Sequence, residues 1–429
     1  MRILVVGAYG LIGSYVTARL LSDGHELTGV GRDVSAARRR LPAVRWVEAD
    51  LRRLDAAGWR VVLEGLQAVV NCAGALQDSP RDDLRAVHTA TTTALADACL
   101  SAGVRRFVQI SAVGVDRDGS PFERTKLEAD RALMATPLEW IILRPGLVLA
   151  PAAYGGSGLL RGLAALPLAM PVSNPDAVVQ TVSIEDVAEA VVRSLSDRTP
   201  ARFTCDLVAS ESTRLRDVLA GLRAWLGFPP VPVVPIPMPL AGVVGRIADG
   251  LAWFGWRSPM RTAALRQLAA GVEGRPEDAD AHLGLRLRGL SATLAGWPAG
   301  VQERWYARLY FLKPLILTVL AVFWAVSGIV GMMQASAAAT RLSDAGFPTP
   351  EANGAVLAGS ITDLALAVLI CSRRTARLAL VGMILVTIGY LVGATLWLPR
   401  LWLDPLGPLV KSLPAAMLAL AALAIMDER

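Results

Sequence analysis

The sequence predicts an α/β domain with a doubly wound parallel sheet and a small second lobe, followed by an all-α domain of four transmembrane helices. Strand-like and helix-like runs alternate through about residue 150, and a glycine-rich turn follows the first apolar run. Long apolar segments dominate after about residue 305. We therefore expect the α/β domain at residues 1–290, with its second lobe from about 151, a linker at 291–305 and the membrane domain at 306–429.

The composition fits a membrane protein of two or three domains rather than a purely water-soluble enzyme. Of the 429 residues, 53% are hydrophobic and only 19% are charged. The net charge of +6 comes from basic residues that form no long stripe and accompany no recognition motif, so we expect no nucleic-acid partner. The scattered cysteines predict a reducing compartment, without a disulfide framework or a metal site. They are Cys72, Cys99, Cys205 and Cys371.

Up to about residue 150, the elements alternate in the order that gives a parallel sheet with helices on both faces. Apolar runs predict strands at 2–6, 26–30, 44–48, 68–72, 105–110 and 139–143. Helical patterns lie between them at 11–22, 33–40, 52–65, 82–102 and 123–135. Sheets of this kind bind ligands at the carboxyl ends of their strands.

The turn after the first strand has the glycine spacing of a dinucleotide-binding site. Gly7 allows a tight turn, Gly10 lets the backbone approach a pyrophosphate, and Gly13 lets the next helix pack against its strand. The other residues of the turn are Ala8, Tyr9, Leu11 and Ile12. The turn therefore predicts a dinucleotide bound at the N-terminus of the helix.

Residues after the next strands indicate which dinucleotide binds. Arg32 stands where an acidic residue would accept the ribose hydroxyls of NAD(H), and an arginine there can pair with a 2′-phosphate. This favours NADP(H) over NAD(H), although the adjacent Asp33 favours the opposite choice. Asp50 ends the third strand and is expected to meet the adenine amino group. The small residues expected along the cofactor are Cys72, Ala73 and Gly74.

The order of these motifs resembles that of the short-chain dehydrogenase/reductase superfamily, in its extended or atypical branch, over about residues 1–290. The motifs are the turn at 7–13, Asp50-Leu51, Asn71-Cys72-Ala73-Gly74, Ser111 after a strand, and Arg144-Pro145-Gly146. Residues 107–111 and 142–146 are similar to NmrA-like proteins and to the NADPH-binding accessory subunit of respiratory complex I. The resemblance implies a Rossmann-type fold. It also implies that further residues bind the cofactor, namely Leu51, Ser111, Lys126, Pro145, Gly146 and Leu147.

The resemblance also implies a catalytic set, from which this sequence departs at one position. The superfamily uses a tyrosine four residues before a lysine, with a serine upstream; Ser111 and Lys126 fit, but Phe122 replaces the tyrosine. In the superfamily the tyrosine transfers a proton and the lysine lowers its pKa, whereas phenylalanine has no proton to give. His88 stands where the superfamily often has an asparagine of the proton relay. It is either an alternative acid or a histidine on the surface of its helix.

Residues 151–290 are expected to form the second lobe over the cleft. Within it, 180–188 resemble the superfamily's strand-to-helix segment, with Asp186 at a helix start. Residues 154–158 predict a mobile loop near the mouth of the cleft. Apolar residues at helical spacing through 240–251, followed by aromatic residues, indicate either a core-facing helix or a helix that lies in a membrane interface.

The last part of the chain predicts four membrane spans, at 314–333, 354–372, 377–398 and 407–426. Basic residues precede the first span and fill the second connection, at 304–313 and 373–377, whereas the first and third connections hold fewer of them. The distribution predicts both termini and the N-terminal domain in the cytoplasm, with the protein in the cytoplasmic (inner) membrane.

The string Asp404-Pro405-Leu406-Gly407-Pro408 resembles the signature of DoxX-like four-helix membrane domains, over about residues 305–429. Asp363 in the second span and Lys411 in the fourth are charges inside apolar segments. Such charges either mark a functional site or form a structural pair between helices, and Asp404 is another partner for the lysine.

Two functions are consistent with the sequence. One is a membrane-anchored, NADP(H)-binding oxidoreductase that acts on a lipophilic or quinone-like substrate, with Ser111 and Lys126 in its active site. An anchor favours this function because it helps chemistry only when the substrate or a partner is in the lipid bilayer. The other is a non-catalytic NADP(H)-binding module that stabilises or regulates a membrane protein complex, which the phenylalanine at position 122 favours.

Overall fold

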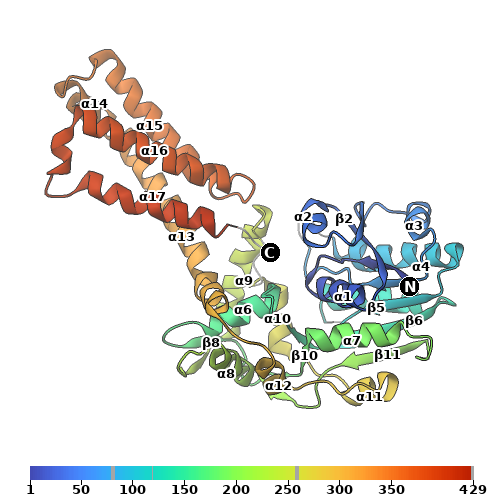
Figure 1. The fold of residues 1–429 in the computed structure, drawn as a ribbon. Helices are drawn as coiled ribbons and strands as arrows, with labels where there is room; N and C mark the ends of the chain where they lie inside the picture. The colour runs from blue at the N-terminus through green and yellow to red at the C-terminus, as the bar shows by residue number, and fades with distance from the viewer. Residues whose placement is uncertain (79–82, 118, 257–259, 427–429) are drawn as a thin grey trace. The chain divides into compact units, whose positions relative to one another are not determined.

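The computed structural model describes residues 1–78, 83–117, 119–256 and 260–426 (Figure 1). The chain forms two compact units, of which the first comprises Met1–Asp249 and Ser258–Ala307. The second comprises Gly250–Arg257 and Arg308–Arg429. The described residues 250–256, which we expected in the α/β domain, are thus grouped with the C-terminal helices.

The first unit is built on a seven-stranded parallel sheet with the strand order β11-β6-β5-β4-β1-β2-β3. All six predicted strands are present. The seventh strand, β11, comes from the second lobe and extends the sheet beyond β6. The strands are β1 (Arg2–Val6), β2 (Glu26–Gly31), β3 (Arg45–Glu48), β4 (Ala68–Asn71), β5 (Arg106–Ile110), β6 (Glu139–Pro145) and β11 (Phe203–Leu207).

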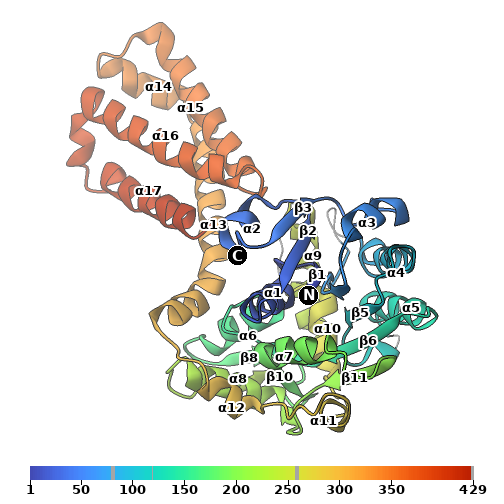
Figure 2. The same cartoon turned by 45° about the vertical axis from the view of Figure 1, so that its right-hand side comes forward.

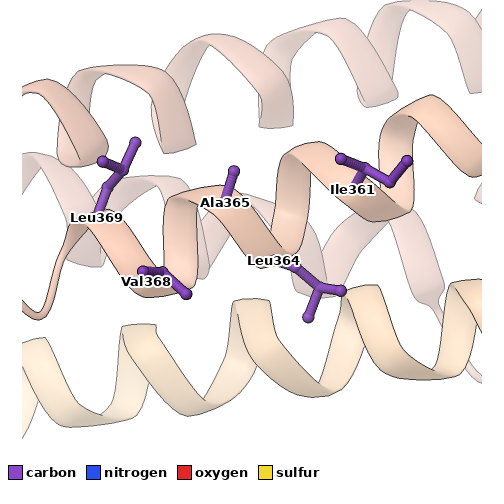
Figure 3. Close-up of a pocket in the computed structure, with 5 residues that line it drawn as sticks. All are labelled: Ile361, Leu364, Ala365, Val368 and Leu369. Atoms are coloured by element: carbon purple, nitrogen blue, oxygen red, sulfur yellow. The ribbon is translucent and has the colours of Figure 1, made fainter.

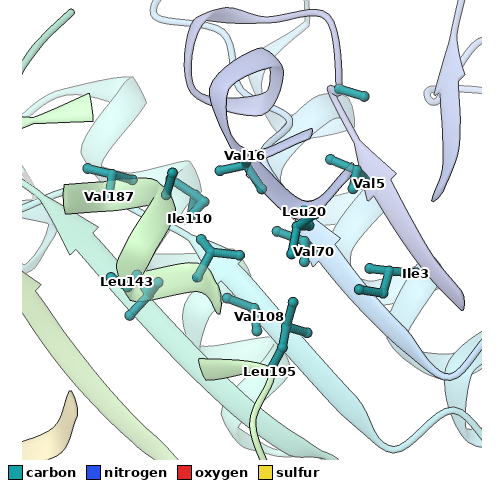
Figure 4. Packing of buried hydrophobic residues seen from close by; sticks show 14 of the residues in the cluster. Ile3, Val5, Val16, Leu20, Val70, Val108, Ile110, Leu143, Val187 and Leu195 are labelled. Carbon is teal, nitrogen blue, oxygen red and sulfur yellow. The ribbon is translucent and has the colours of Figure 1, made fainter. Parts of the chain in front are cut away.

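Helices cover both faces of this sheet, as predicted. Figure 2 shows α3, α4 and α5 on one side and α1 and α7 on the other. Figure 4 shows Val16 and Leu20 of α1 and Val187 of α7 against apolar side chains of the strands. The opposite face is covered by Trp59 of α3 and Leu95 of α4. These helices are α1 (Leu11–Ser22), α2 (Ser35–Arg40), α3 (Ala56–Leu63), α4 (Thr91–Ala102) with a π-helical turn before it (Ala86–Ala90), α5 (Pro121–Met134) and α7 (Ile184–Ser194).

The strand order places a topological switch point between β1 and β4. From β1 the chain builds outward through β2 and β3, and it then returns to β4 and builds the other half of the sheet. The loops after β1 and β4 therefore leave neighbouring strands in opposite directions, and doubly wound sheets bind their ligands at the carboxyl ends of such a pair of strands.

The second lobe contains short two-stranded sheets and helices. One predicted feature of this lobe is wrong, because residues 155–158 begin a helix instead of forming a loop. The Tyr154 amide donates to the Ser157 hydroxyl at 3.3 Å, and that hydroxyl donates back to the Tyr154 carbonyl at 2.9 Å, which starts the helix. The further elements of the second lobe are β7 (Leu147–Leu149), α6 (Gly155–Ala164), β8 (Met170–Val172), β9 (Val178–Val179), β10 (Thr181–Ser183), β12 (Thr213–Arg214), α8 (Leu215–Trp225), β13 (Val233–Pro235), α9 (Met238–Trp253), α10 (Thr262–Ala270), α11 (Glu277–Leu283) and α12 (Leu290–Ala295).

The strand-to-helix segment that the sequence predicted in this lobe is present as β10 and α7. Ser183 caps the helix by accepting from the Glu185 amide at 3.3 Å. Asp186 lies in the first turn and binds Arg288, at 2.9 Å through the Arg288 amide and at 3.0 Å through its Nε. The acidic residue at the helix start therefore connects this lobe to the chain segment before α12.

Helices that pack against one another make up most of the second unit (Figure 1). They are α13 (Val301–Met333), α14 (Ala335–Asp344), α15 (Thr349–Leu369), α16 (Ala376–Trp397) and α17 (Pro408–Ala424). Among the described residues, α13, α15 and α16 are long and apolar enough to cross a membrane, whereas α17 is a shorter apolar helix of 17 residues. A membrane-capable helical unit is therefore present, and the count of four spans stays a prediction.

Asp363 lies inside this helical unit, where the sequence left its role open. Its side chain is buried, with Oδ2 accepting from the Ser327 hydroxyl at 2.6 Å and Oδ1 from the Tyr390 hydroxyl at 2.7 Å. These three residues come from α15, α13 and α16. Lys411 is exposed, so within the described residues Asp363 binds hydroxyl groups and not the lysine.

Candidate cofactor and catalytic site

The glycine-rich turn forms a backbone cradle at the end of β1. Gly7 has a φ of +74°, and a Cβ at this position would lie 2.9 Å from the Cys72 carbonyl oxygen. A Cβ at Gly13 would collide with the Gly7 carbonyl, so both positions need glycine. Gly10 is the N-cap of α1 and supplies no side-chain cap, so the first amide groups of the helix are available to a ligand. This cradle fits a dinucleotide pyrophosphate.

The turn after β4 lies against the cradle and is held by Asn71. The buried Asn71 amide group donates to Gln109 Oε1 at 2.9 Å and to Thr92 Oγ1 at 3.2 Å. Its Oδ1 accepts from the Ala73 amide at 3.1 Å. Three elements therefore fix the path of residues 72–74, and the structure brings this predicted segment and the glycine turn together.

The residues predicted to select the cofactor lie at the ends of β2 and β3. The Arg32 amide donates to the Tyr9 hydroxyl at 3.3 Å, and the Tyr9 ring fills the space beside Gly31. The Asp50 carboxylate binds Arg52, with Nη2 at 2.6 Å from Oδ2. Hydrogen bonding by Arg52 lowers the pKa of Asp50 to about 2, and the charge of Arg32 contributes to the same shift. The carboxylate expected to meet the adenine thus already binds a basic residue, Arg52, that the sequence analysis missed.

Lys126 is buried where the carboxyl ends of β4 and β5 meet. Its Nζ donates to the Ile110 carbonyl at 2.9 Å and to the Ala73 carbonyl at 3.3 Å. An ammonium group has three N–H donors, and the described residues accept from two of them, which leaves one for a ligand. Burial lowers the pKa of Lys126 to about 8, against the opposing effects of Asp130 and Cys72.

His88 is buried, so the expectation of a histidine on the helix surface is wrong. The π-helical turn at Ala86–Ala90 changes the side-chain register that a regular helix would give. His88 Nε2 lies 3.1 Å from the Ala75 amide nitrogen, and because that amide can only donate, Nε2 is the acceptor. The ring proton therefore belongs on Nδ1, which lies 2.8 Å from Thr125 Oγ1. Burial, with the charge of Lys126, lowers the pKa of His88 to about 2. The ring is therefore neutral, and both its nitrogens have partners within the protein, which argues against a role as the alternative acid.

Phe122 occupies the position one helical turn before Lys126. Its half-buried ring meets the edge of His88, with the ring centroids 5.6 Å apart and an angle of 81° between the planes. The pair is a packing contact between two uncharged rings. The position of the superfamily's tyrosine is thus filled by an apolar group beside the neutral histidine.

Ser111 belongs to a buried network that sequence reasoning missed. Its hydroxyl donates to Asp130 Oδ2 at 2.7 Å, and Arg144 Nη2 donates to the same oxygen at 3.3 Å. Arg144 also binds Asp116, with Nη1 at 2.6 Å from Oδ2. Burial raises the pKa of Asp130, although Ser111, Arg144 and Lys126 act in the opposite direction. The Ser111 proton is therefore engaged by a carboxylate. A signal for Asp130 was present, since it follows Lys126 by four residues on one helix face.

The predicted residues after β6 carry the chain from the sheet into the second lobe. The Gly146 amide donates to the Leu207 carbonyl of β11 at 3.0 Å, and the Leu147 amide donates to the Gln180 carbonyl at 3.0 Å. A Cβ at Gly146 would lie 2.6 Å from that Gln180 oxygen. Pro145, Gly146 and Leu147 thus lie at the carboxyl end of β6 and connect the cofactor-binding sheet to the lobe above it.

Two parts of the chain match known protein families. Residues 7–198 match the NAD(P)H-binding family, and residues 321–420 match the DoxX-like family. The first match contains the glycine turn, Lys126 and the Ser111 network. The second contains the buried carboxylate of Asp363.

Relatives with similar sequences cover different shares of the chain. An uncharacterized protein of Mycobacterium tuberculosis is 28% identical over 250 residues, which are 58% of this chain and 26% of that protein. Sterol demethylase protein B of Methylococcus capsulatus is 29% identical over 338 residues, which are 71% of this chain and 99% of that protein. The chain thus spans about a quarter of the length of the mycobacterial relatives it matches.

Solved structures share the fold of the first unit. The NADPH-dependent quinone oxidoreductase QOR2 of Escherichia coli, solved with NADPH, has a TM-score of 0.54 at 17% identity, covering 68% of this chain and 99% of that one. UDP-glucuronic acid 4-epimerase of Bacillus cereus, solved with NAD, has a TM-score of 0.54 at 16% identity, covering 73% and 99%. One neighbour holds NADPH and the other NAD, so the likeness does not determine the preferred cofactor.

We expect the affinity for NADPH to fall as the pH rises through about 8, because the Lys126 ammonium then loses the proton that strengthens its hydrogen bond to a ligand. Unfolding does not account for such a loss. The lysine pKa is lower in the folded chain than its ordinary value of 10.5, so the unfolded chain binds more protons between these values and the folded state gains stability as the pH rises.

The measurement is calorimetric titration of NADPH into detergent-extracted protein on both sides of pH 8. The matched control is Lys126→Arg, whose guanidinium keeps its charge over this range, so its affinity should stay flat. An unchanged affinity of the native protein across pH 8, or the same decline in Lys126→Met, would contradict a role for the ammonium in cofactor binding.

Proposed function

We propose that the protein is a membrane-bound, NADP(H)-dependent oxidoreductase that acts on a lipophilic, quinone-like substrate. The proposal is supported by the combination of domains, because the chain joins an NAD(P)H-binding Rossmann domain of the short-chain dehydrogenase/reductase and NmrA-like type to a C-terminal DoxX-like domain. Lys126 binds the cofactor in this proposal, and Ser111 with Asp130 positions the β5 end of the site. The bound cofactor supplies a hydride from its nicotinamide.

The observation that carries this proposal is the apolar ring of Phe122 beside the neutral His88, one turn before the buried Lys126. Reduction of an ordinary ketone needs a proton donor at the developing alkoxide, which general acid catalysis by a protein group accelerates by about 10²–10⁴-fold. The described site offers a cofactor-binding lysine without a hydroxyl group at the position of the acid. The site therefore suits an acceptor that needs little help from a protein acid.

A quinone is such an acceptor. It takes one hydride and one proton to become a hydroquinone, and the aromatic anion formed by hydride transfer is stable enough for solvent to protonate it. The fold neighbour QOR2 is an NADPH-dependent quinone oxidoreductase, which supports this substrate class. The apolar helices support it as well, because quinones with long apolar tails are dissolved in the bilayer.

The membrane helices offer an apolar surface to such a molecule. A shallow, open groove on α15 is lined by apolar side chains alone (Figure 3). They are Ile361, Leu364, Ala365, Val368 and Leu369. The groove suits a lipid chain or the tail of a lipophilic substrate, so it supports a lipophilic partner without identifying one.

A second function is favoured by the same phenylalanine. A chain that binds NADP(H) without an acid for carbonyl chemistry is suited to a non-catalytic module that stabilises or regulates a membrane protein complex. The two functions differ in one measurable respect, which is turnover with a quinone acceptor.

The proposal includes a location in the cytoplasmic membrane, with four spans and both termini in the cytoplasm. Basic residues support it, since Arg304, Arg308 and Lys313 precede the apolar part of α13. Arg373 and Arg374 stand between α15 and α16, and Arg377 lies in the first turn of α16. This orientation leaves the cofactor domain in the compartment where NADPH is produced and used.

The substrate class is tested by the oxidation of NADPH with different acceptors. We expect turnover with short-chain quinones and little or none with simple ketones, because the site lacks the general acid. Phe122→Tyr restores a phenol one turn before Lys126 and should raise ketone turnover, although less than in a complete site because the Ser111 hydroxyl is bound to Asp130. The matched control is Phe228→Tyr, which adds the same hydroxyl outside the candidate site and should change nothing.

Rapid reduction of a simple ketone by the native protein would contradict the proposal. Tight NADPH binding with no turnover for any acceptor would favour the non-catalytic function instead.

The cofactor preference is tested by Arg32→Ala. If the guanidinium binds the 2′-phosphate, its loss removes a charge-assisted hydrogen bond of about 1.5–3 kcal/mol, which weakens NADPH binding by roughly ten- to a hundred-fold and leaves NADH binding nearly unchanged. Calorimetry with both cofactors measures the difference. Arg53→Ala, an exposed arginine near the same strand ends, should leave both affinities as they are. Equal losses for both cofactors in Arg32→Ala would exclude the 2′-phosphate role.

The orientation is tested by cysteine labelling of intact cells in a variant without native cysteines. Asp344→Cys, at the end of α14, should react with a membrane-impermeant reagent from outside. Arg374→Cys, between α15 and α16, should react only after the membrane is opened. The reverse pattern would overturn the proposed orientation, and labelling of both positions from one side would overturn the span count.

A further inference from the structure

Helix α9 (Met238–Trp253) has its small residues on the inside and its large apolar residues on the outside. The buried positions are Ala241, Gly245, Ala248 and Ala252, which recur at intervals of four, three and four residues and so share one helix face. A helix that stabilises a water-soluble core does the reverse, because it buries its large apolar side chains.

The outward face of α9 carries large apolar side chains along its length, with the exposed Arg246 beside them. Ile247 is 61% exposed and Trp253 is 78% exposed. The exposed apolar side chains of the helix and its end are Met238, Leu240, Val243, Val244, Ile247, Leu251, Trp253 and Phe254. Of the two alternatives that the sequence left open, the core-facing helix is therefore wrong.

Specific contacts hold α9 in this orientation. Gly245 packs so closely on Thr262 that a Cβ would lie 2.8 Å from the Thr262 Cγ2 atom. Asp249 accepts hydrogen bonds from Thr262 Oγ1 at 2.6 Å, from Arg261 Nε at 3.1 Å and from Gln77 Nε2 at 2.9 Å. These contacts oppose rotation of the helix about its axis, so it cannot turn its large side chains inward.

The residues that follow α9 are bonded to the connection between two membrane-capable helices. Trp256 Nε1 donates to the Cys371 carbonyl at 2.7 Å, and the Arg373 amide donates to the Phe254 carbonyl at 3.0 Å. The Arg373 guanidinium lies over the Trp256 ring, 5.8 Å from its centroid. Cys371 and Arg373 belong to the connection between α15 and α16, where two apolar helices end. The chain segment that follows α9 is therefore held at the ends of two apolar helices of its own unit.

We propose that α9 lies in the plane of the membrane surface, with its large apolar side chains among the lipid headgroups and upper acyl chains. Helices of this kind are buried about 5–10 Å into the boundary between headgroups and acyl chains. Trp253, Phe254 and Trp256 then stand at the depth that aromatic belts occupy. The exposed Arg246 and the arginines that follow α15 meet anionic headgroups.

This inference concerns the second lobe and is independent of the substrate. The lobe that α9 belongs to is held at the bilayer by a second attachment besides the spanning helices. The attachment serves any chemistry or regulation that involves a molecule dissolved in the membrane, and the proposal stands or fails separately from quinone turnover.

The experiment measures the depth of the outward face in the full-length protein. Ile247→Cys, in a variant without native cysteines, is labelled with an environment-sensitive nitrobenzoxadiazole dye and reconstituted into nanodiscs of phosphatidylcholine and phosphatidylglycerol. We expect a blue-shifted emission, loss of emission when the lipids carry a nitroxide near the headgroup, and little quenching by aqueous iodide. Val243→Cys, one turn earlier on the same face, should behave in the same way.

The matched control is Leu100→Cys on α4, another exposed apolar position of the first unit. Its dye should be quenched by iodide and not by the lipid nitroxide. NADPH binding by each labelled protein shows that the fold is retained. Quenching of the dyes at 243 and 247 by iodide, as at position 100, would overturn the proposal. Shielding of these dyes from both quenchers would also overturn it, because a second copy of the chain or another protein would then cover the face.

Discussion

The close approach of two backbone turns at the switch point is the constraint on which the cofactor site depends. Gly7 passes so near the Cys72 carbonyl that a Cβ has no room, and Asn71 holds the facing turn through three hydrogen bonds. Lys126 then donates to the carbonyl of Ala73 in that same turn. The phosphate cradle, the segment along the cofactor and the buried ammonium are therefore fixed relative to one another by one region of backbone packing.

Burial then decides which groups of the site carry charge. His88 and Lys126 share a region from which water is excluded, and the histidine is neutral because both burial and the nearby ammonium disfavour a second cation. Its proton is committed to Thr125, and that of Ser111 to Asp130. The described site therefore presents the Lys126 cation, whereas the His88 and Ser111 protons are bound within the protein and Phe122 carries none. This imbalance is the physical reason to prefer an acceptor that solvent can protonate.

Periodicity and turn residues predicted the parallel sheet, because each strand and helix there is a continuous local pattern. They did not predict β11, which reaches the sheet only after a long excursion through the second lobe. The glycine turn could be predicted from local spacing, and Lys126 from the resemblance to the short-chain dehydrogenase/reductase superfamily. The partners of Ser111 could not, because Asp130, Arg144 and Asp116 meet only in the folded chain. The helix at residues 155–164 was missed because glycines disfavour helices and tertiary packing overrode that preference.

The two interpretations of α9 show what decides between a core helix and an interfacial helix. Both predict the same apolar stripe, so the stripe itself cannot discriminate. The other face can, because a buried face made of Ala241, Gly245 and Ala248 leaves room only for close backbone approach, as at Thr262. Large apolar side chains on the same helix must then find an apolar environment elsewhere. For a helix bonded at its end to membrane-capable segments, the lipid surface is the environment that is continuous with the rest of the chain.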